Sequence, residues 1–240
     1  MSVVGKTLYP PAVCRQERGS VVCAATIAIL GATMLGIHAR PQISKVTEPV
    51  ARRLVRLGVT PDALTIVGTI GVSGGALGFY PRGEFFVGTL VITAFVFSDL
   101  LDGAVARVRG SSGPWGAFLD STLDRVGDGA VFGALALWYA GDGNSITLCA
   151  VAIYDLVAGA VTSYAKARAE GLGMTANVGI AERSERLIAI LMLTGLSGLL
   201  HVPVLRAIAL WGLAAATTVT VIQRVVEVRR QSRLLTATPR

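Results

Sequence analysis

Charged residues are scarce in this chain of 240 residues. Asp, Glu, Lys and Arg make up 15% of it and hydrophobic residues 52%, whereas a soluble globular domain has about 25% charged residues. This deficit excludes an ordinary water-soluble domain and indicates that lipid surrounds most of the chain. The net charge of +7 would suggest a nucleic-acid ligand in a soluble protein. Here the Lys and Arg residues cluster between apolar segments, so we expect membrane lipid, and no nucleic acid, as the partner.

Cysteine and histidine are also rare. Cys14, Cys23 and Cys149 have no metal-binding spacing and indicate no disulfide framework. The two histidines, His38 and His201, have no ligand partner at helical spacing, so we interpret both as residues of the membrane interface.

Long apolar stretches dominate the rest of the sequence. Six of them have about the 20 residues that a helix needs to cross a bilayer: 62–80, 85–106, 117–140, 145–166, 185–202 and 204–225. They do not alternate in the short units of a transmembrane barrel. Because lipid offers no hydrogen bonds to the backbone, the stretches predict an all-α integral membrane protein with six transmembrane helices.

Positive charge marks alternate connections between these stretches. Lys and Arg are frequent before the first stretch, after the second, after the fourth and after the last, and sparse elsewhere. The positive-inside rule therefore predicts cytoplasmic termini and a multi-pass protein of the plasma membrane. The connection between the second and third spans, where we expect the active site, would then face the cytoplasm.

The region before the first span predicts a juxtamembrane amphipathic segment over 34–60. Apolar and basic residues of 43–58 separate onto different helix faces, Gly58 is a plausible end, and Thr60 is a suitable cap for a helix that begins at Pro61. Residues 61–228 would form the six-helix domain and 229–240 a basic cytoplasmic tail. The extension 1–33 allows three interpretations: a signal-like segment, a seventh helix, or an untranslated stretch before a start at Met34, which we favour. We expect no catalytic role there.

Four aspartates lie around the connection between the second and third spans. Asp99 and Asp102 are three residues apart, Asp120 and Asp124 are four apart, and turn-forming residues separate the pairs. Each pair therefore shares a helix face, and the two helices can run antiparallel with the pairs opposed. Four carboxylates at membrane depth need cations, and hard oxygen ligands favour one or two Mg²⁺ or Mn²⁺ ions.

Other residues near the aspartates fit a phosphate-bearing ligand. Gly103 and Gly116 permit close approach, and Arg107 can bind phosphate through its guanidinium fork. Asp128, four residues after Asp124, is a candidate partner of the metal site or of Arg125. Proton relay and simple pairing with arginine are the alternative roles of intramembrane acids, but four acids at these spacings favour a catalytic metal site.

The complete pattern is D-x2-D-G-x2-A-R-x8-G-x3-D-x3-D, and its defined positions are Asp99, Asp102, Gly103, Ala106, Arg107, Gly116, Asp120 and Asp124. It resembles the signature of the CDP-alcohol phosphotransferases over about residues 40–230. The resemblance implies a homodimeric enzyme with six transmembrane helices after an amphipathic helix. Such an enzyme transfers the phosphatidyl group of a CDP-linked donor to an alcohol and releases CMP.

The resemblance also implies roles for single residues. Asp99, Asp102 and Asp120 would hold one metal ion, and Asp99, Asp120 and Asp124 a second. Asp124 would also be the general base. The CDP part of the donor, CDP-diacylglycerol, would contact Asp62, Ala63, Leu64, Thr65, Gly103 and Arg107. Gly113 stands where relatives have a hydroxyl residue, so it would contribute only its backbone, or Ser111 or Ser112 would substitute.

Two strings, SYAKARAEGLG (163–173) and GIAERSERLI (179–188), resemble the actinobacterial phosphatidylinositol phosphate synthases. The acceptor would then be inositol 1-phosphate (D-myo-inositol 3-phosphate), whose phosphate would bind a basic pocket of Lys166, Arg168, Arg186 and Arg224. These residues are alternatively ordinary positive-inside charges. Glycerol 3-phosphate is a second candidate acceptor, giving a phosphatidylglycerophosphate synthase. A divalent-cation transporter is the non-enzymatic alternative, although acids clustered near one face oppose it.

Overall fold

The structure is a computed structural model that describes residues 48–110 and 113–237, apart from the side chains of 98–100, 236 and 237. The extension 1–33, the first part of the segment 34–60, and Ser111 and Ser112 lie outside the described residues.

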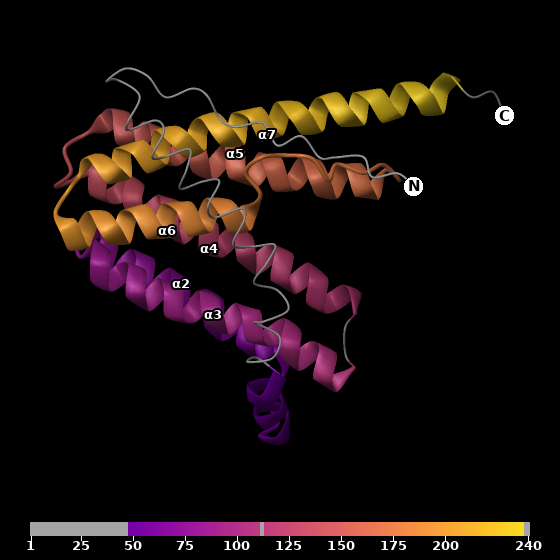
Figure 1. Cartoon of the computed structure of the whole chain (residues 1–240), viewed down its shortest axis with the longest axis horizontal. Helices are drawn as coiled ribbons and strands as arrows, with labels where there is room; N and C mark the ends of the chain where they lie inside the picture. Colours follow the sequence, from indigo (N-terminus) through magenta and orange to yellow (C-terminus); the bar gives the residue numbers. More distant parts are fainter. Residues whose placement is uncertain (1–47, 111–112, 238–240) are drawn as a thin grey trace, which may run out of the picture.

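The described chain is all-helical, as predicted. A short helix over 48–56 leads into six long helices, and the longest connection between them, 172–182, joins α5 to α6 (Figure 1). Their bounds are α2 Pro61–Phe79, α3 Phe85–Arg109, α4 Pro114–Ala140, α5 Ile146–Gly171, α6 Arg183–Leu200 and α7 Val204–Ala237, and a 3₁₀ turn, η1 Tyr80–Arg82, follows α2.

The helices pack in a closed order. α2 contacts α3 and α4, α4 contacts α5, α5 contacts α7, and α6 closes the bundle against α7 and α3. The core between them is apolar and includes Tyr80, Ile92, Leu135, Ile190 and Leu210, all fully buried. A smaller cluster joins Ala51 of the short helix to Ala104 and Val105 of α3. The short helix is thereby fixed beside the end of α3 and the beginning of α2.

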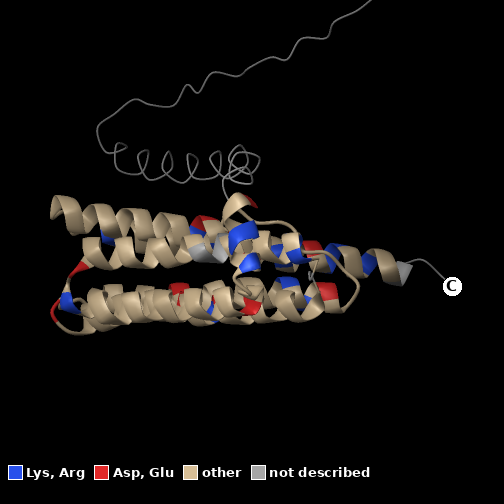
Figure 2. Ribbon diagram, turned by 90° about the horizontal axis from the view of Figure 1, so that it is seen from below, with Lys and Arg blue, Asp and Glu red and all other residues tan. Residues whose placement is uncertain are grey.

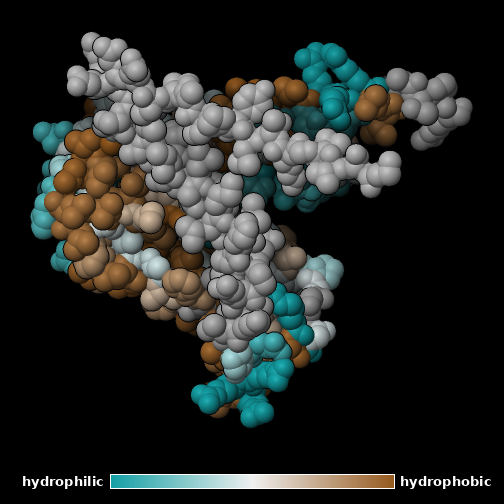
Figure 3. All heavy atoms as spheres, in the orientation of Figure 1, coloured by the Kyte–Doolittle hydropathy of each residue, from teal (hydrophilic) through white to brown (hydrophobic). Residues whose placement is uncertain are grey.

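The outer surface of the bundle is also apolar. Every long helix exposes large hydrophobic side chains, such as Ile70 of α2, Leu90 of α3 and Ile222 of α7. Figure 3 shows this hydrophobic surface over the bundle, with hydrophilic residues toward its far ends. A continuous apolar exterior of this kind is typical of a surface that lipid covers.

Four helices in the described chain are long and apolar enough to cross a membrane: Pro61–Arg82, Phe85–Arg109, Ile146–Gly171 and Val204–Leu235. The remaining predicted spans correspond to α4 and α6, which carry charged residues such as Asp124, Asp128 and Arg186. The chain is therefore an integral membrane protein. Charged side chains are buried inside its bundle on α4, α5, α6 and α7, among them Asp128, Asp155, Arg186 and Arg224.

The start of the helical domain follows the predicted signals. Thr60 is extended and its Oγ1 accepts a hydrogen bond from the Ala63 amide at 3.2 Å, while Pro61 is the first residue of α2. Gly58 has a φ of +80° after the short helix, a conformation that suits glycine.

The predicted apolar stretches locate the helices, but three of them end too early. α3, α5 and α7 continue to residues 109, 171 and 237, beyond the predicted ends at 106, 166 and 225. Arg, Lys, Glu and Ala have good helix propensity, so a helix continues after its apolar stretch stops. Figure 2 shows Lys and Arg gathered toward the half of the bundle that contains the C-terminal end of α7. We call this half the basic end.

Close contact between α3 and α6 generates a stability prediction. A Cβ at Gly198 would lie 2.6 Å from the Phe86 amide nitrogen, whereas a Cβ at the exposed Gly74 would meet no heavy atom within 4 Å. Gly198→Ala should force the helices apart and destabilise the protein by about 1–3 kcal/mol. Gly74→Ala, the matched control, should leave stability unchanged or slightly higher. Thermal unfolding in detergent micelles would measure both, and equal melting temperatures would contradict the packing described here.

Candidate active site

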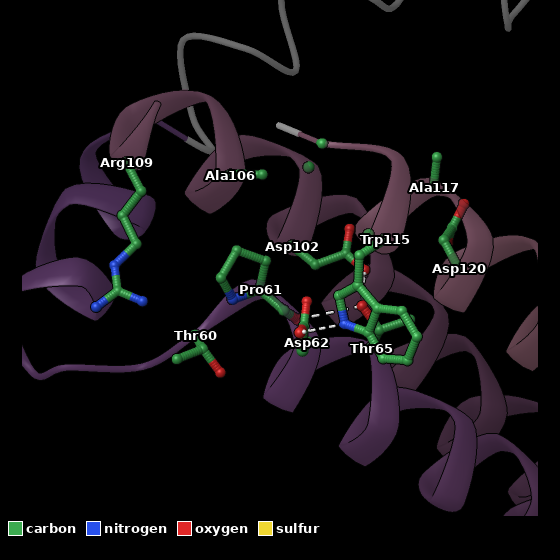
Figure 4. A pocket seen from close by; sticks show the side chains of 13 residues that line it. Thr60, Pro61, Asp62, Thr65, Asp102, Ala106, Arg109, Trp115, Ala117 and Asp120 are labelled. Atoms are coloured by element: carbon green, nitrogen blue, oxygen red, sulfur yellow. Dashed lines mark hydrogen bonds between the residues drawn. The ribbon is translucent and has the colours of Figure 1, made fainter. Parts of the chain in front are cut away.

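A cavity of about 600 Å³ lies between three helix ends at the basic end of the bundle (Figure 4). The N-terminal turn of α2, the C-terminal part of α3 and the first turns of α4 form its walls. The lining residues are Thr60, Pro61, Asp62, Thr65, Asp102, Gly103, Ala106, Arg109, Gly113, Trp115, Gly116, Ala117 and Asp120.

The N-terminus of α2 gives one wall of this cavity. Amide groups at a helix N-terminus and the helix dipole favour a negatively charged ligand. Of the four consecutive residues predicted to contact the nucleotide, Asp62 and Thr65 line the cavity and Ala63 and Leu64 do not. Leu64 instead packs beside Ala51, against the end of α3.

Two signature aspartates face the cavity from different helices. Asp102 of α3 accepts a hydrogen bond from Thr65 Oγ1 at 2.6 Å, and Asp120 enters from α4. The same Thr65 hydroxyl lies 3.1 Å from the Pro61 carbonyl oxygen. Thr65 therefore connects the beginning of α2 to a predicted metal ligand.

Glycine leaves parts of the cavity wall without side chains. Gly103, Gly113 and Gly116 all line it. Arg107, predicted to contact the donor, does not line the cavity, but its guanidinium lies beside Gly103, where an added Cβ would be 3.5 Å from Arg107 Nη1. Arg107 can therefore approach a ligand that enters over this glycine.

Several cavity residues were missing from the predicted site, and Trp115 and Arg109 have the largest side chains among them. Trp115 donates a hydrogen bond from Nε1 to Asp62 Oδ2 at 3.0 Å, which joins α4 to α2, and Arg109 lines the opposite side (Figure 4). A tryptophan beside a basic turn at a membrane interface was an available signal, because its ring is apolar and its N–H is polar.

The predicted metal ligands have the chemistry of a divalent-cation site. Carboxylates are hard oxygen donors, and Asp102 and Asp120 face one cavity, so the residues present fit Mg²⁺ or Mn²⁺. Among the side chains that the structure describes, no three His, Cys, Asp or Glu residues form a cluster able to hold an ion. The predicted fourth ligand, Asp99, lies on α3 one turn before Asp102, and its side chain is outside the described residues.

Asp124 lies one turn after Asp120 on α4, in contact with arginine. Arg183 Nη1, from the first turn of α6, is 2.7 Å from Asp124 Oδ1, and Arg125 Nη2 is 3.7 Å from Asp124 Oδ2. The distance of 2.7 Å is typical of a charge-assisted hydrogen bond. The predicted general base is thus part of an ion-pair network.

The next turn of α4 extends this network. Asp128, a buried residue, lies 3.4 Å from Arg183 Nε, 3.5 Å from Arg186 Nη2 and 3.7 Å from Arg125 Nη2. The predicted pairing of Asp128 with Arg125 is therefore present, and two arginines of α6 join it. We call Asp124, Asp128, Arg125, Arg183 and Arg186 the arginine–aspartate cluster.

The four residues predicted to bind the acceptor phosphate do not line one cavity. Arg168 and Arg224 line a second cavity of about 580 Å³ between α5 and α7, whereas Lys166 and Arg186 do not. Arg186 is 3% exposed and contacts Asp128 and the Ala181 carbonyl oxygen. Arg224, equally buried, donates to the carbonyl oxygens of Val178 and Thr162. Both buried arginines therefore also stabilise the packing of the helices and the connection before α6.

Comparison with known proteins matches residues 58–223 to the CDP-alcohol phosphatidyltransferase family. The chain is 55% identical over 214 residues to a phosphatidylinositol phosphate synthase of Streptomyces avermitilis, covering 87% of this chain and 88% of the relative. It is 46% identical over 200 residues to one of Cutibacterium acnes, covering 80% and 97%.

Solved structures of the Mycobacterium tuberculosis phosphatidylinositol phosphate synthase are also similar. The structure with CDP-DAG bound is 43% identical in sequence and has a TM-score of 0.74. The match covers 77% of this chain and 94% of the other. The structure in complex with manganese and citrate is 43% identical in sequence and has a TM-score of 0.71. That match covers 76% of this chain and 88% of the other.

Because Arg186 is buried and Arg168 is exposed, substitution of Arg186 should lower the stability of the protein more than substitution of Arg168. Arg186→Gln removes a cation from the buried Asp128, so it should destabilise the protein by about 3 kcal/mol. Arg168→Gln alters an exposed residue of the same charge and should change stability by less than about 0.5 kcal/mol. Thermal unfolding of both variants in one detergent checks the difference, and an unaffected Arg186→Gln variant would show that the buried contacts contribute little.

Proposed function

The chain belongs to the CDP-alcohol phosphatidyltransferase family, and we propose that it is a phosphatidylinositol phosphate synthase. It is a metal-dependent membrane enzyme that transfers the phosphatidyl group of CDP-diacylglycerol to inositol 1-phosphate (D-myo-inositol 3-phosphate) and releases CMP. The observation that carries this proposal is the convergence of the family's signature residues on one cavity. Asp102, Gly103, Ala106, Gly116 and Asp120 all line it, at the N-terminus of α2.

The donor would bind with its nucleotide and pyrophosphate in this cavity. The α2 N-terminus, with Asp62 and Thr65, forms one wall, and Gly103 and Gly113 let a ligand approach the backbone. Arg107 beside Gly103 would contact the CDP part, and Ala63 and Leu64 would contribute only backbone. The apolar exterior of the helices would leave the acyl chains in the lipid.

Carboxylates on two helices would hold two divalent cations, Mg²⁺ or Mn²⁺. Asp99, Asp102 and Asp120 would ligate one, and Asp99, Asp120 and Asp124 the other. Bound cations of this kind supply charge neutralisation at the pyrophosphate and at the departing CMP. The donor chemistry of these side chains, and the opening of Asp102 and Asp120 into one cavity, support the assignment.

Asp124 would act as the general base. It would take the proton of the acceptor hydroxyl while that oxygen forms a bond to the phosphorus of the phosphatidyl group. The phosphorus–oxygen bond to CMP then breaks, and CMP departs with the electron pair. The position of Asp124 on the same helix as Asp120, one turn away, supports this role because both carboxylates lie at the same end of the bundle.

The acceptor phosphate would be bound by Lys166, Arg168, Arg186 and Arg224. A phosphate monoester needs several cationic donors, and all four residues belong to the basic end of α5, α6 and α7. Arg168 and Arg224 line one cavity, which supports their cooperation. Arg186 and Arg224 would bind the phosphate without losing their contacts to Asp128 and to the backbone carbonyl oxygens.

We also propose that α4 and α6 span the plasma membrane with the other four helices, so that the domain 61–228 has six spans. The segment 34–60 would lie along the membrane surface and 229–240 would form a cytoplasmic tail, with no catalytic role for 1–33. The gathering of Lys and Arg at the basic end supports an active site that faces the cytoplasm (Figure 2). A homodimer, which the resemblance to the family implies, would be the assembly of the chain in the membrane.

The release of CMP from CDP-diacylglycerol by purified protein tests the proposal. We expect turnover with Mg²⁺ and inositol 1-phosphate, far less with free inositol or glycerol 3-phosphate, and none after EDTA until Mg²⁺ or Mn²⁺ is restored. Asp120→Asn should abolish turnover because it alters a proposed metal ligand. Asp142→Asn, which alters an exposed aspartate in the α4–α5 turn, should retain turnover.

Preferred use of glycerol 3-phosphate would replace the proposed acceptor and leave the metal-site assignments in place. Full turnover in EDTA would contradict those assignments. Absence of CMP release with every acceptor, from folded protein supplied with metal, would reject the proposed reaction.

A further inference from the structure

Asp124 and Asp128 form ion pairs with the same two arginines, Arg183 and Arg125. Arg183 spans both carboxylates, with Nη1 at 2.7 Å from Asp124 Oδ1 and Nε at 3.4 Å from Asp128 Oδ1. Arg125 is shared equally, since its Nη2 is 3.7 Å from an oxygen of each aspartate. The two carboxylates therefore compete for positive charge across one helical turn.

A proposed metal ligand that accepts a bond from a guanidinium presents a conflict. The arginine engages an oxygen of the carboxylate that the cation needs, and it repels the cation as a like charge. Asp124 and Asp128 side chains are only 14% and 10% exposed, so water screens these interactions weakly. The strength with which arginine binds Asp124 should therefore set how well Asp124 binds a divalent cation.

Asp128 has contacts that can weaken the binding of arginine to Asp124. It lies within 3.7 Å of three arginines, and one of them, Arg186, is itself fixed by a hydrogen bond from Nη1 to the Ala181 carbonyl oxygen at 3.2 Å. A capping box between Glu182 and Glu185 fixes the same turn of α6. The first turn of α6, and with it Arg183, is thereby anchored beside Asp128.

We propose that Asp128 is a positioning residue: its charge competes with Asp124 for Arg183 and Arg125, weakens their binding to Asp124 and so keeps Asp124 available to a divalent cation. Without the charge of Asp128, both arginines would be drawn more strongly to Asp124. This inference rests on the proposed function, in which Asp124 is a metal ligand. It adds a residue outside the family signature on which the affinity for metal depends.

Calorimetric titration of the purified full-length protein with Mn²⁺, without substrates, tests this role. Asp128→Asn keeps the size of the side chain and removes its charge, and it should weaken Mn²⁺ binding about tenfold or more. Arg183→Gln alone should tighten binding roughly fivefold, the effect of removing one partly exposed ion pair. Asp128→Asn combined with Arg183→Gln should regain most of the affinity lost in the single Asp128 variant. Asp142→Asn is the matched control and should bind as the wild type does.

The rescue distinguishes positioning from a purely structural role. If Asp128 only tethered α6, the second substitution would loosen the cluster further and restore nothing. Wild-type affinity in Asp128→Asn, or weaker binding in Arg183→Gln, would overturn the inference while leaving the proposed function intact. Failure of the wild type itself to bind Mn²⁺ would overturn the proposed metal site and this inference together.

Discussion

The cost of placing carboxylates inside an apolar bundle governs the arrangement at its basic end. Asp102, Asp124 and Asp128 each require a donor or a cation, because lipid and apolar side chains cannot stabilise their charge. Thr65 of α2 supplies a donor to Asp102, and the arginine–aspartate cluster supplies cations from α4 and α6. Two further helices, α2 and α6, are thereby brought against the acidic faces of α3 and α4. The contacts that satisfy the acids also build the proposed catalytic site.

This arrangement separates two kinds of binding surface. The first cavity, between α2, α3 and α4, combines aspartates, glycines and a helix N-terminus, which suits a nucleotide pyrophosphate with its cations. The second, between α5 and α7, includes Arg168 and Arg224 and no acidic residue, which suits a phosphate monoester. The arginine–aspartate cluster joins α4 to the beginning of α6, close to the proposed base. Asp124 lines neither cavity; it lies one turn after Asp120 of the first and contacts Arg183 of α6.

Local signals in the sequence predicted the features that depend on neighbouring residues. The cap at Thr60, the first helical position at Pro61 and the helix stop at Gly58 follow from backbone chemistry alone. The ends of the helices were harder to predict, because the length of an apolar stretch reflects contact with lipid and a helix can continue beyond it. The burial of Arg186 and Arg224 was also missed as a structural feature. It depends on partners far away in the sequence: the Asp128 carboxylate for Arg186, and the Thr162 and Val178 carbonyl oxygens for Arg224. Spacing identified the aspartates, but only tertiary packing reveals which arginine reaches which aspartate.

Direct location of the metal tests whether carboxylates of α3 and α4 bind divalent cations at the cavity. Crystals of the protein soaked with Mn²⁺, measured at a wavelength where manganese scatters anomalously, would locate the ions independently of turnover. We expect two anomalous peaks within bonding distance of oxygens of Asp99, Asp102, Asp120 and Asp124, and a distance from Arg183 Nη1 to Asp124 Oδ1 longer than 2.7 Å. Peaks elsewhere in the molecule, or none between these aspartates, would contradict this metal site.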